Sequence, residues 1–97
     1  MSRKNAPVWV QKEDALNHQY EYQLGQNLRQ LREARGYTQE QVAMMLQLYG
    51  CDITRSALAK IEVAQRHLYP DEIYAFHLIY RAPLGTIFPP FPEEGQD

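Results

Sequence analysis

The sequence is short of three things, and each shortage argues against a class of protein. It holds a single cysteine, Cys51, so an internal disulfide is excluded and a reducing compartment, the cytoplasm, is expected. No apolar run approaches the ~18–20 residues that span a bilayer, and no signal peptide opens the chain, so we expect no membrane partner. Positive charge is not in excess: the formal net charge is -2, which argues mildly against a nucleic-acid partner.

Catalytic and metal-binding motifs are also missing. The histidines (His18, His67 and His77) and Cys51 are scattered, without the spacing of metal ligands. The sequence contains no GxSxG, P-loop or HExxH motif. We therefore expect no enzyme, no metal site and no cofactor. Cys51 is interpreted as a passive core or linker residue rather than a redox-sensitive thiol.

What the sequence does hold is typical of one soluble globular domain. It has 97 residues, of which 44% are apolar and 23% charged. The charge is unevenly spread: residues 24–68 carry six arginines and lysines against four carboxylates, and the acidity lies toward the C-terminus. This distribution allows DNA binding without establishing it.

The rest of the chain is organised around residues 38–67, which predict two short helices with a connection between them. Thr38 is placed to cap the first helix, with Gln41 as its capping-box partner. An apolar stripe follows at helical spacing: Val42, Met45, Leu46 and Tyr49. The connection, residues 47–53, is longer than a minimal turn, with Gly50 at the bend and Leu48 and Ile53 as predicted anchors to the core.

The second helix of this pair begins after Thr54, a predicted N-cap. Leu58 and Ile61 are predicted to face inward. The side chains left facing outward are those of Arg55, Ser56 and Lys60. The pattern predicts a helix-turn-helix with a cationic outer face.

The segments before this pair divide into an arm and a helix. Residues 1–12 are predicted to form an N-terminal arm, since Pro7 disfavours a helix there, and Trp9 either packs on its own domain or reaches a partner subunit or DNA. Helical periodicity runs from Glu13 to Arg35. Gly25 lies inside it, which leaves open one long helix or two that meet near this glycine. Gly36 is predicted to end the helix in a left-handed conformation.

After the pair, Pro70 is predicted to open another helix, with the anions Asp71 and Glu72 in its first turn. Its apolar face is broad: Ile73, Phe76, Leu78, Ile79 and Tyr80. A further short turn is predicted over residues 84–88. The domain is thus predicted to span residues 13–88, and residues 89–97 a disordered tail.

Three segments together resemble a known family: LRQLREARGYTQEQVA, ITRSALAKIE and YRAPLGTIFP. Over residues 24–88 they are similar to the XRE-type helix-turn-helix family of phage repressors and Cro proteins. The resemblance implies an all-α, lambda-repressor-like bundle of about five helices. It also implies that residues 55–63 form a recognition helix in the major groove of DNA.

The resemblance further implies roles for individual residues. Gln39 would bond a backbone phosphate, and Arg32 would pair with Glu62 as a structural link. The side chains that would reach base edges are those of Arg55, Ser56 and Lys60. Thr54 and Arg66 complete the candidate DNA contacts, Arg66 lying with His67 at the exit of the helix. The sequence departs from the family pattern in its longer connection and in Ala64, where a glycine is common.

We expect a cytoplasmic regulator of transcription, such as a repressor, that binds double-stranded DNA as a homodimer. The dimer contact is expected in the N-terminal arm with Trp9 or in the last helix with Phe76 and Tyr80. The alternative is a protein-binding helical module of the antitoxin kind, whose helices mainly hold a protein partner.

Overall fold

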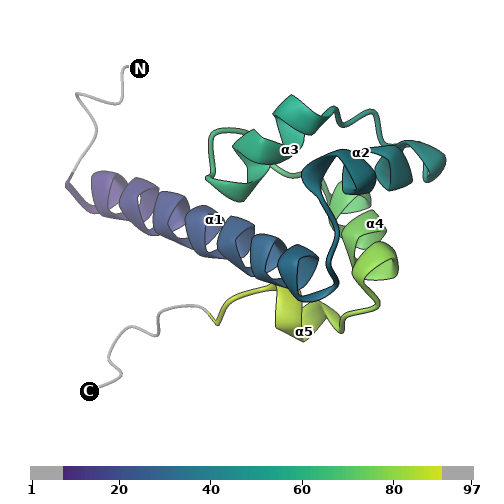
Figure 1. Cartoon of the computed structure of the whole chain (residues 1–97). Coiled ribbons are helices and arrows are strands. Elements are labelled where there is room, and N and C mark those ends of the chain that lie inside the picture. The colour runs from purple at the N-terminus through teal and green to yellow at the C-terminus, as the bar shows by residue number, and fades with distance from the viewer. Residues whose placement is uncertain (1–7, 91–97) are drawn as a thin grey trace.

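The chain is helical throughout the part that the computed structural model describes, which is residues 8–90 for the backbone and 18–90 for side chains. Its helices are α1 (Val8–Ala34), α2 (Gln39–Leu48), α3 (Arg55–Glu62), α4 (Pro70–Tyr80) and α5 (Leu84–Ile87). Figure 1 shows the four shorter helices gathered around the C-terminal half of α1. The predicted all-α class, with about five helices, is confirmed.

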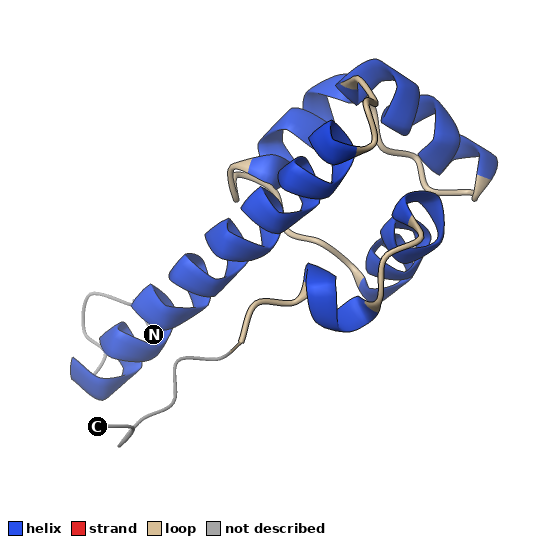
Figure 2. Ribbon diagram, turned by 60° about the horizontal axis from the view of Figure 1, so that its bottom comes forward, coloured by secondary structure: helices blue, strands red, loops and turns tan. Residues whose placement is uncertain are grey.

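Helix α1 is one uninterrupted helix, which resolves the alternative that the sequence left open. It begins at Val8, immediately after Pro7, so residues 8–12 are helical although they were predicted to belong to an arm. Its N-terminal half projects beyond the other helices (Figure 2). Residues 1–7 and the side chain of Trp9 lie outside the described part of the structure.

Gly25 lets α1 approach the end of α3. A Cβ atom at this position would lie 2.5 Å from the carbonyl oxygen of Ile61 and 2.8 Å from that of Glu62. Both neighbours are backbone atoms and cannot swing aside as a side-chain tip can. The glycine therefore sets how closely α1 and α3 pack, and its cost in helix propensity is accepted for that contact.

The helix boundaries follow the predicted caps. The Thr38 hydroxyl accepts a hydrogen bond from the Gln41 N–H, and the Gln41 side chain accepts one from the Thr38 N–H, which completes the capping box. The Thr54 hydroxyl accepts from the Ala57 N–H at the start of α3. Gly36 has a φ of 71°, so the left-handed end of α1 is confirmed.

All the helices contribute to a single core. Its fully buried side chains include Leu28 from α1, Leu46 from α2, Leu58 from α3, Phe76 from α4 and Ile87 from α5. Complete burial of an aliphatic or aromatic side chain of this size stabilises a fold by about 1.5–3 kcal/mol.

The end of α2 differs from the prediction. Leu48 and Tyr49, predicted as core residues, are 87% and 53% exposed. The reason is that α2 ends at Leu48 and the chain then turns at Gly50, whose φ is 84°. Ile53 and Cys51, from the connection to α3, fill the core instead.

The last two helices begin as predicted. Pro70 opens α4, with acidic side chains in the first turn, and a short helix α5 follows Pro83. Phe76 and Tyr80 are fully buried, so the prediction that this helix forms a dimer contact through them is wrong. The Asn27 side chain donates to the Ile87 carbonyl oxygen over 3.0 Å and ties α5 to α1. Residues 91–97 of the predicted tail lie outside the described part.

Candidate nucleic-acid interface

Helix α3 has one buried side and one open side. Leu58, Ile61 and Glu62 face the interior. Arg55, Ser56 and Lys60 are all exposed. Within the described part of the chain, neither Arg55 nor Lys60 makes an ion pair or side-chain hydrogen bond. Ser56 and Lys60 lie one helical turn apart, so they share a face. The open side of α3 is therefore a cationic surface that is not neutralised by described neighbours.

A buried ion pair fixes α3 to α1. Arg32 Nε donates to Glu62 Oε2 over 2.7 Å, and Arg32 Nη2 donates to Glu62 Oε1 over 3.1 Å. Glu62 is only 2% exposed. The hydrogen bonds that Arg32 donates to Glu62 raise the pKa of Arg32 despite its desolvation, so the guanidinium stays charged. This bidentate geometry holds the two helices in one register.

Gln39, at the first position of α2, joins the same network. Its Nε2 donates to Glu62 Oε1 over 3.0 Å. The Arg32 Nη1 also donates to the Tyr37 carbonyl oxygen over 3.0 Å, in the turn before α2. Glu62 therefore links α1, the start of α2 and the end of α3. The remaining amide hydrogen of Gln39 and the free N–H groups of the first turn of α2 stay available for an anion.

A hollow of about 540 Å³ brings Gln39 and Arg55 together. It lies where the turn between α1 and α2 meets the start of α3, and Gly36, Thr38 and Glu40 also line it. Sequence reasoning picked out Gln39 and Arg55 separately and missed the hollow, because their proximity depends on how α2 packs against α3. The Glu40 carboxylate is the one unfavourable group for an anion at this place, within the part that is described.

Arg66, a predicted DNA contact, forms an ion pair within the protein. Its Nη1 and Nη2 donate to Glu72 Oε1 and Oε2, each over 3.0 Å, across the connection from α3 to α4. Burial would raise the pKa of Glu72, but the hydrogen bonds from Arg66 and from the Tyr69 N–H lower it below its usual value. His67 Nδ1 lies 2.5 Å from Glu21 Oε2. Both predicted phosphate contacts at this exit are thus occupied by carboxylates.

The chain leaves α3 at Ala64, the position where a glycine is common in the resembling family. The φ of Ala64 is 61°, in the left-handed region that a glycine adopts without strain. The Gln65 N–H donates to the Lys60 carbonyl oxygen over 2.8 Å, as in a glycine-ended helix. The chain therefore leaves α3 along the path a glycine would take, with an alanine in the strained position.

Cys51 and the histidines do not form a reactive or metal-binding site in the described part of the structure. Cys51 is buried, and burial raises the pKa of its thiol, which makes it a poor nucleophile. Among the described side chains, no group of three histidine, cysteine or acidic residues is placed to hold a metal ion. No helix in the described part is long and apolar enough to cross a bilayer.

Most of the chain matches a known protein family. The sequence model of a family described as a helix-turn-helix domain matches residues 23–85, which is more than half of the chain. The match is consistent with the resemblance to XRE-type proteins. No curated protein matches the chain. No solved structure matches it either.

Proposed function

Because the chain belongs to the helix-turn-helix domain family, we propose that it is a transcriptional regulator that binds double-stranded DNA sequence-specifically. Helix α3 lies in the major groove, which is about 12 Å wide and admits an α-helix. The observation that carries the proposal is the open side of α3, where Arg55, Ser56 and Lys60 are exposed beside a buried network that fixes the helix.

The roles of these side chains follow from their chemistry. Arg55 donates two parallel hydrogen bonds to O6 and N7 of a guanine, a contact worth about 1–3 kcal/mol of discrimination. Lys60 contacts a guanine or a phosphate, and Ser56 a base or a phosphate. The Thr54 hydroxyl, at the cap of α3, is placed to donate to a phosphate while it accepts from Ala57.

Gln39 positions the backbone of the DNA. Its side chain is held by Glu62, and it opens α2, where the helix dipole and free N–H groups favour an anion. A phosphate in the hollow between Gln39 and Arg55 would fix the angle at which α3 enters the groove. Arg66 is a further candidate phosphate contact, which would form beside or in place of its ion pair with Glu72.

The working form is a cytoplasmic homodimer on a near-palindromic site, in which two copies of α3 lie one helical turn of DNA apart. The first turn of α1, which contains Trp9, is the remaining candidate for the contact between the copies, since Phe76 and Tyr80 are buried.

Selection of bound sites from random duplex DNA, with the full chain, tests the proposal. A recurring half-site, repeated in inverted orientation at fixed spacing, is the expected result. Binding of the selected site should then fall at least tenfold in Arg55→Ala and Lys60→Ala variants. Arg29→Ala removes a cation that pairs with Glu33 on α1 and serves as the matched control. Recovery of no preferred sequence, with a copurified protein covering α3, would favour the antitoxin-like module instead.

A further inference from the structure

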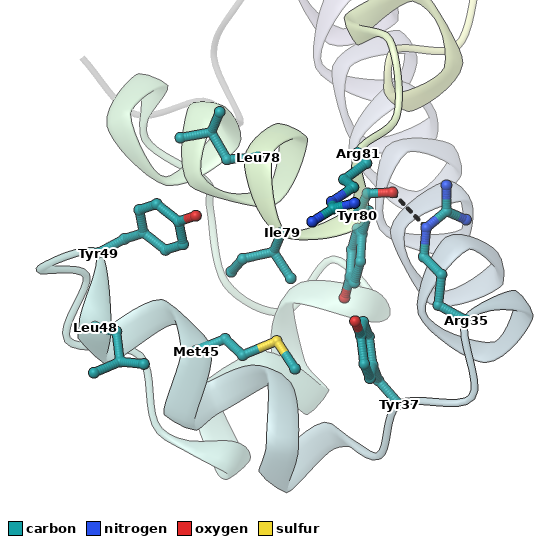
Figure 3. A pocket seen from close by; sticks show the side chains of 9 residues that line it. All are labelled: Arg35, Tyr37, Met45, Leu48, Tyr49, Leu78, Ile79, Tyr80 and Arg81. Carbon is teal, nitrogen blue, oxygen red and sulfur yellow. Dashed lines mark hydrogen bonds between the residues drawn. The ribbon is translucent and has the colours of Figure 1, made fainter.

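A second concave surface lies between the C-terminal halves of α2 and α4 (Figure 3), and it shares Tyr37 with the hollow at the start of α3. Its volume is about 750 Å³, within the range of small-molecule sites in proteins. One end is apolar and formed by Leu48, Tyr49 and Leu78, and Met45 and Ile79 lie along the middle. The DNA-binding proposal uses none of these residues. We call this surface the α2–α4 groove.

The other end of the α2–α4 groove is cationic. Arg35 and Arg81 lie there, and no carboxylate lines the groove. Arg35 Nε donates to the Tyr80 carbonyl oxygen, and its Nη1 donates to the Leu31 carbonyl oxygen over 3.3 Å. These bonds fix the guanidinium, and its Nη2 has no partner within residues 18–90. Arg81 follows α4 in a left-handed conformation and has no ion pair or side-chain hydrogen bond with the described residues.

A buried hydroxyl lies at the cationic end. The Tyr80 side chain is fully buried, and its hydroxyl has no hydrogen-bond partner among the described residues. Its phenol points toward that of Tyr37, which also lines the groove (Figure 3). Burial raises the pKa of Tyr80, so the hydroxyl remains a neutral donor. A buried donor left without an acceptor is unfavourable, and an acceptor oxygen that reached it would remove that penalty.

We propose that the α2–α4 groove binds a small amphipathic carboxylate, such as a medium-chain alkyl or aryl-alkyl acid. The carboxylate lies between the guanidiniums of Arg35 and Arg81, with the phenols of Tyr37 and Tyr80 beneath it. The apolar body extends along Met45 and Ile79 toward the apolar end. Guanidinium groups suit this role because their paired N–H donors match both oxygens of a carboxylate.

The acidic segment after Pro90 has the same chemistry, but its starting point argues against it as the occupant. Pro89 and Pro90 line a small hollow with Gln19, Tyr20 and Gln23 of α1. Arg35 lies fifteen residues beyond Tyr20, or about 22 Å along the helix axis. Residues 91–97 span at most about 25 Å when fully extended. They would reach the cationic end only when stretched, without filling the groove.

Titration of the full chain with sodium octanoate and with 4-phenylbutyrate, followed by calorimetry and by amide NMR shifts, tests this proposal without DNA. We expect saturable binding with shifts centred on Met45 and Ile79. Octanamide, which has the same body without the charge, should bind at least tenfold more weakly. Equal affinity for the acid and the amide would overturn the proposal, as would the absence of saturation.

Two variants locate the ligand. Arg81→Asn, in which asparagine tolerates the left-handed conformation, should weaken octanoate binding at least tenfold. Leu48→Ser should weaken octanoate binding several-fold. Met44→Ser makes the same kind of change, from an exposed apolar residue to serine, outside the groove on the same helix, and should not weaken it. Unchanged binding in Arg81→Asn would overturn the proposed orientation and with it the site.

A full-length variant with Glu93→Gln, Glu94→Gln and Asp97→Asn tests the competing occupant. The proposal expects no change in the Met45 and Ile79 amide signals of the ligand-free protein. A shift of those signals toward new positions would show that the acidic segment itself, from the same or a second copy, occupies the α2–α4 groove. That result would replace the small carboxylate as its ligand.

Discussion

A methyl group added to Gly25 would lie 2.5 Å from the carbonyl oxygen of Ile61, closer than any ordinary contact between carbon and oxygen. The two residues belong to α1 and α3, and their close approach sets how tightly these two helices pack. A glycine in the middle of a long helix is thus explained by its neighbour across the helix interface.

Gly25→Ala should therefore destabilise the protein, although the same change in an exposed helix stabilises it by about 1 kcal/mol. Overpacking against backbone costs about 1–3 kcal/mol, so the free energy of unfolding should fall, as measured in urea. Gly85→Ala is the control, because nothing lies within 4 Å of its added methyl group. Equal stability of the two variants would contradict the close approach.

Ala64→Gly should have the opposite effect. Ala64 has a φ of 61°, and the left-handed conformation costs a residue with a Cβ about 1–2 kcal/mol. Removing that strain should raise the free energy of unfolding by about 1 kcal/mol. Ala59→Gly, inside α3, should instead lower it by a similar amount. A destabilised Ala64→Gly variant would show that the alanine is not strained.

Loss of one member of the Arg32–Glu62 pair should be costly. Glu62→Ala leaves a buried guanidinium without its carboxylate, for which about 3–5 kcal/mol of destabilisation is expected. The double variant Arg32→Leu with Glu62→Leu should lose less than Glu62→Ala alone, since no charge is left unpaired. Urea unfolding of the single variants Arg32→Leu and Glu62→Leu, together with the double variant, measures the coupling energy. Additive losses would contradict a coupled pair.

Acid should weaken the link between α3 and α4. The pKa of Glu72 is lowered in the folded protein, so its contribution is fully present above its unfolded pKa of about 4.3 and is lost as the pH falls through the folded value. Glu72→Gln should remove that part of the pH dependence of unfolding below pH 5. Glu33→Gln, in an exposed pair with Arg29, is the control and should change the free energy of unfolding at pH 7 by at most about 1 kcal/mol.

The Arg55→Ala and Lys60→Ala variants should lose different parts of DNA binding, sequence preference in the first and overall affinity in the second. Loss of a bidentate guanine contact relaxes the preference at one base pair, with a loss of about 1–3 kcal/mol there. Loss of a phosphate contact weakens all sequences alike and reduces the salt slope by about 0.9. Binding to selected and scrambled duplexes across a salt series distinguishes the two. Arg55→Ala binding with unaltered preference would remove Arg55 from base recognition.

The features predicted correctly from the sequence are local ones. The capping boxes and helix ends depend on residues three or four apart, so Thr38, Thr54 and Gly36 were identifiable without a fold. The apolar positions with clear helical spacing, such as Leu58 and Ile61, were also placed correctly.

The features that were missed depend on how separate helices meet. Helix α4 is apolar on most sides, so its sequence does not show that Phe76 and Tyr80 face inward. The pairing of Arg66 with Glu72 spans the connection between two helices. Its only signal was a glutamate in the first turn after Pro70, which also serves to cap that helix.

In the proposed mode of binding, the shortness of α3 limits how much DNA sequence one copy can read. Eight residues span about 12 Å, which covers three or four base pairs at about 3.4 Å each. A word of four base pairs recurs by chance about once in 256 positions, against the millions of competing sites in a genome. A single domain would thus bind thousands of chance matches across a genome. Binding one site in preference to these requires contacts from more than one copy of the protein.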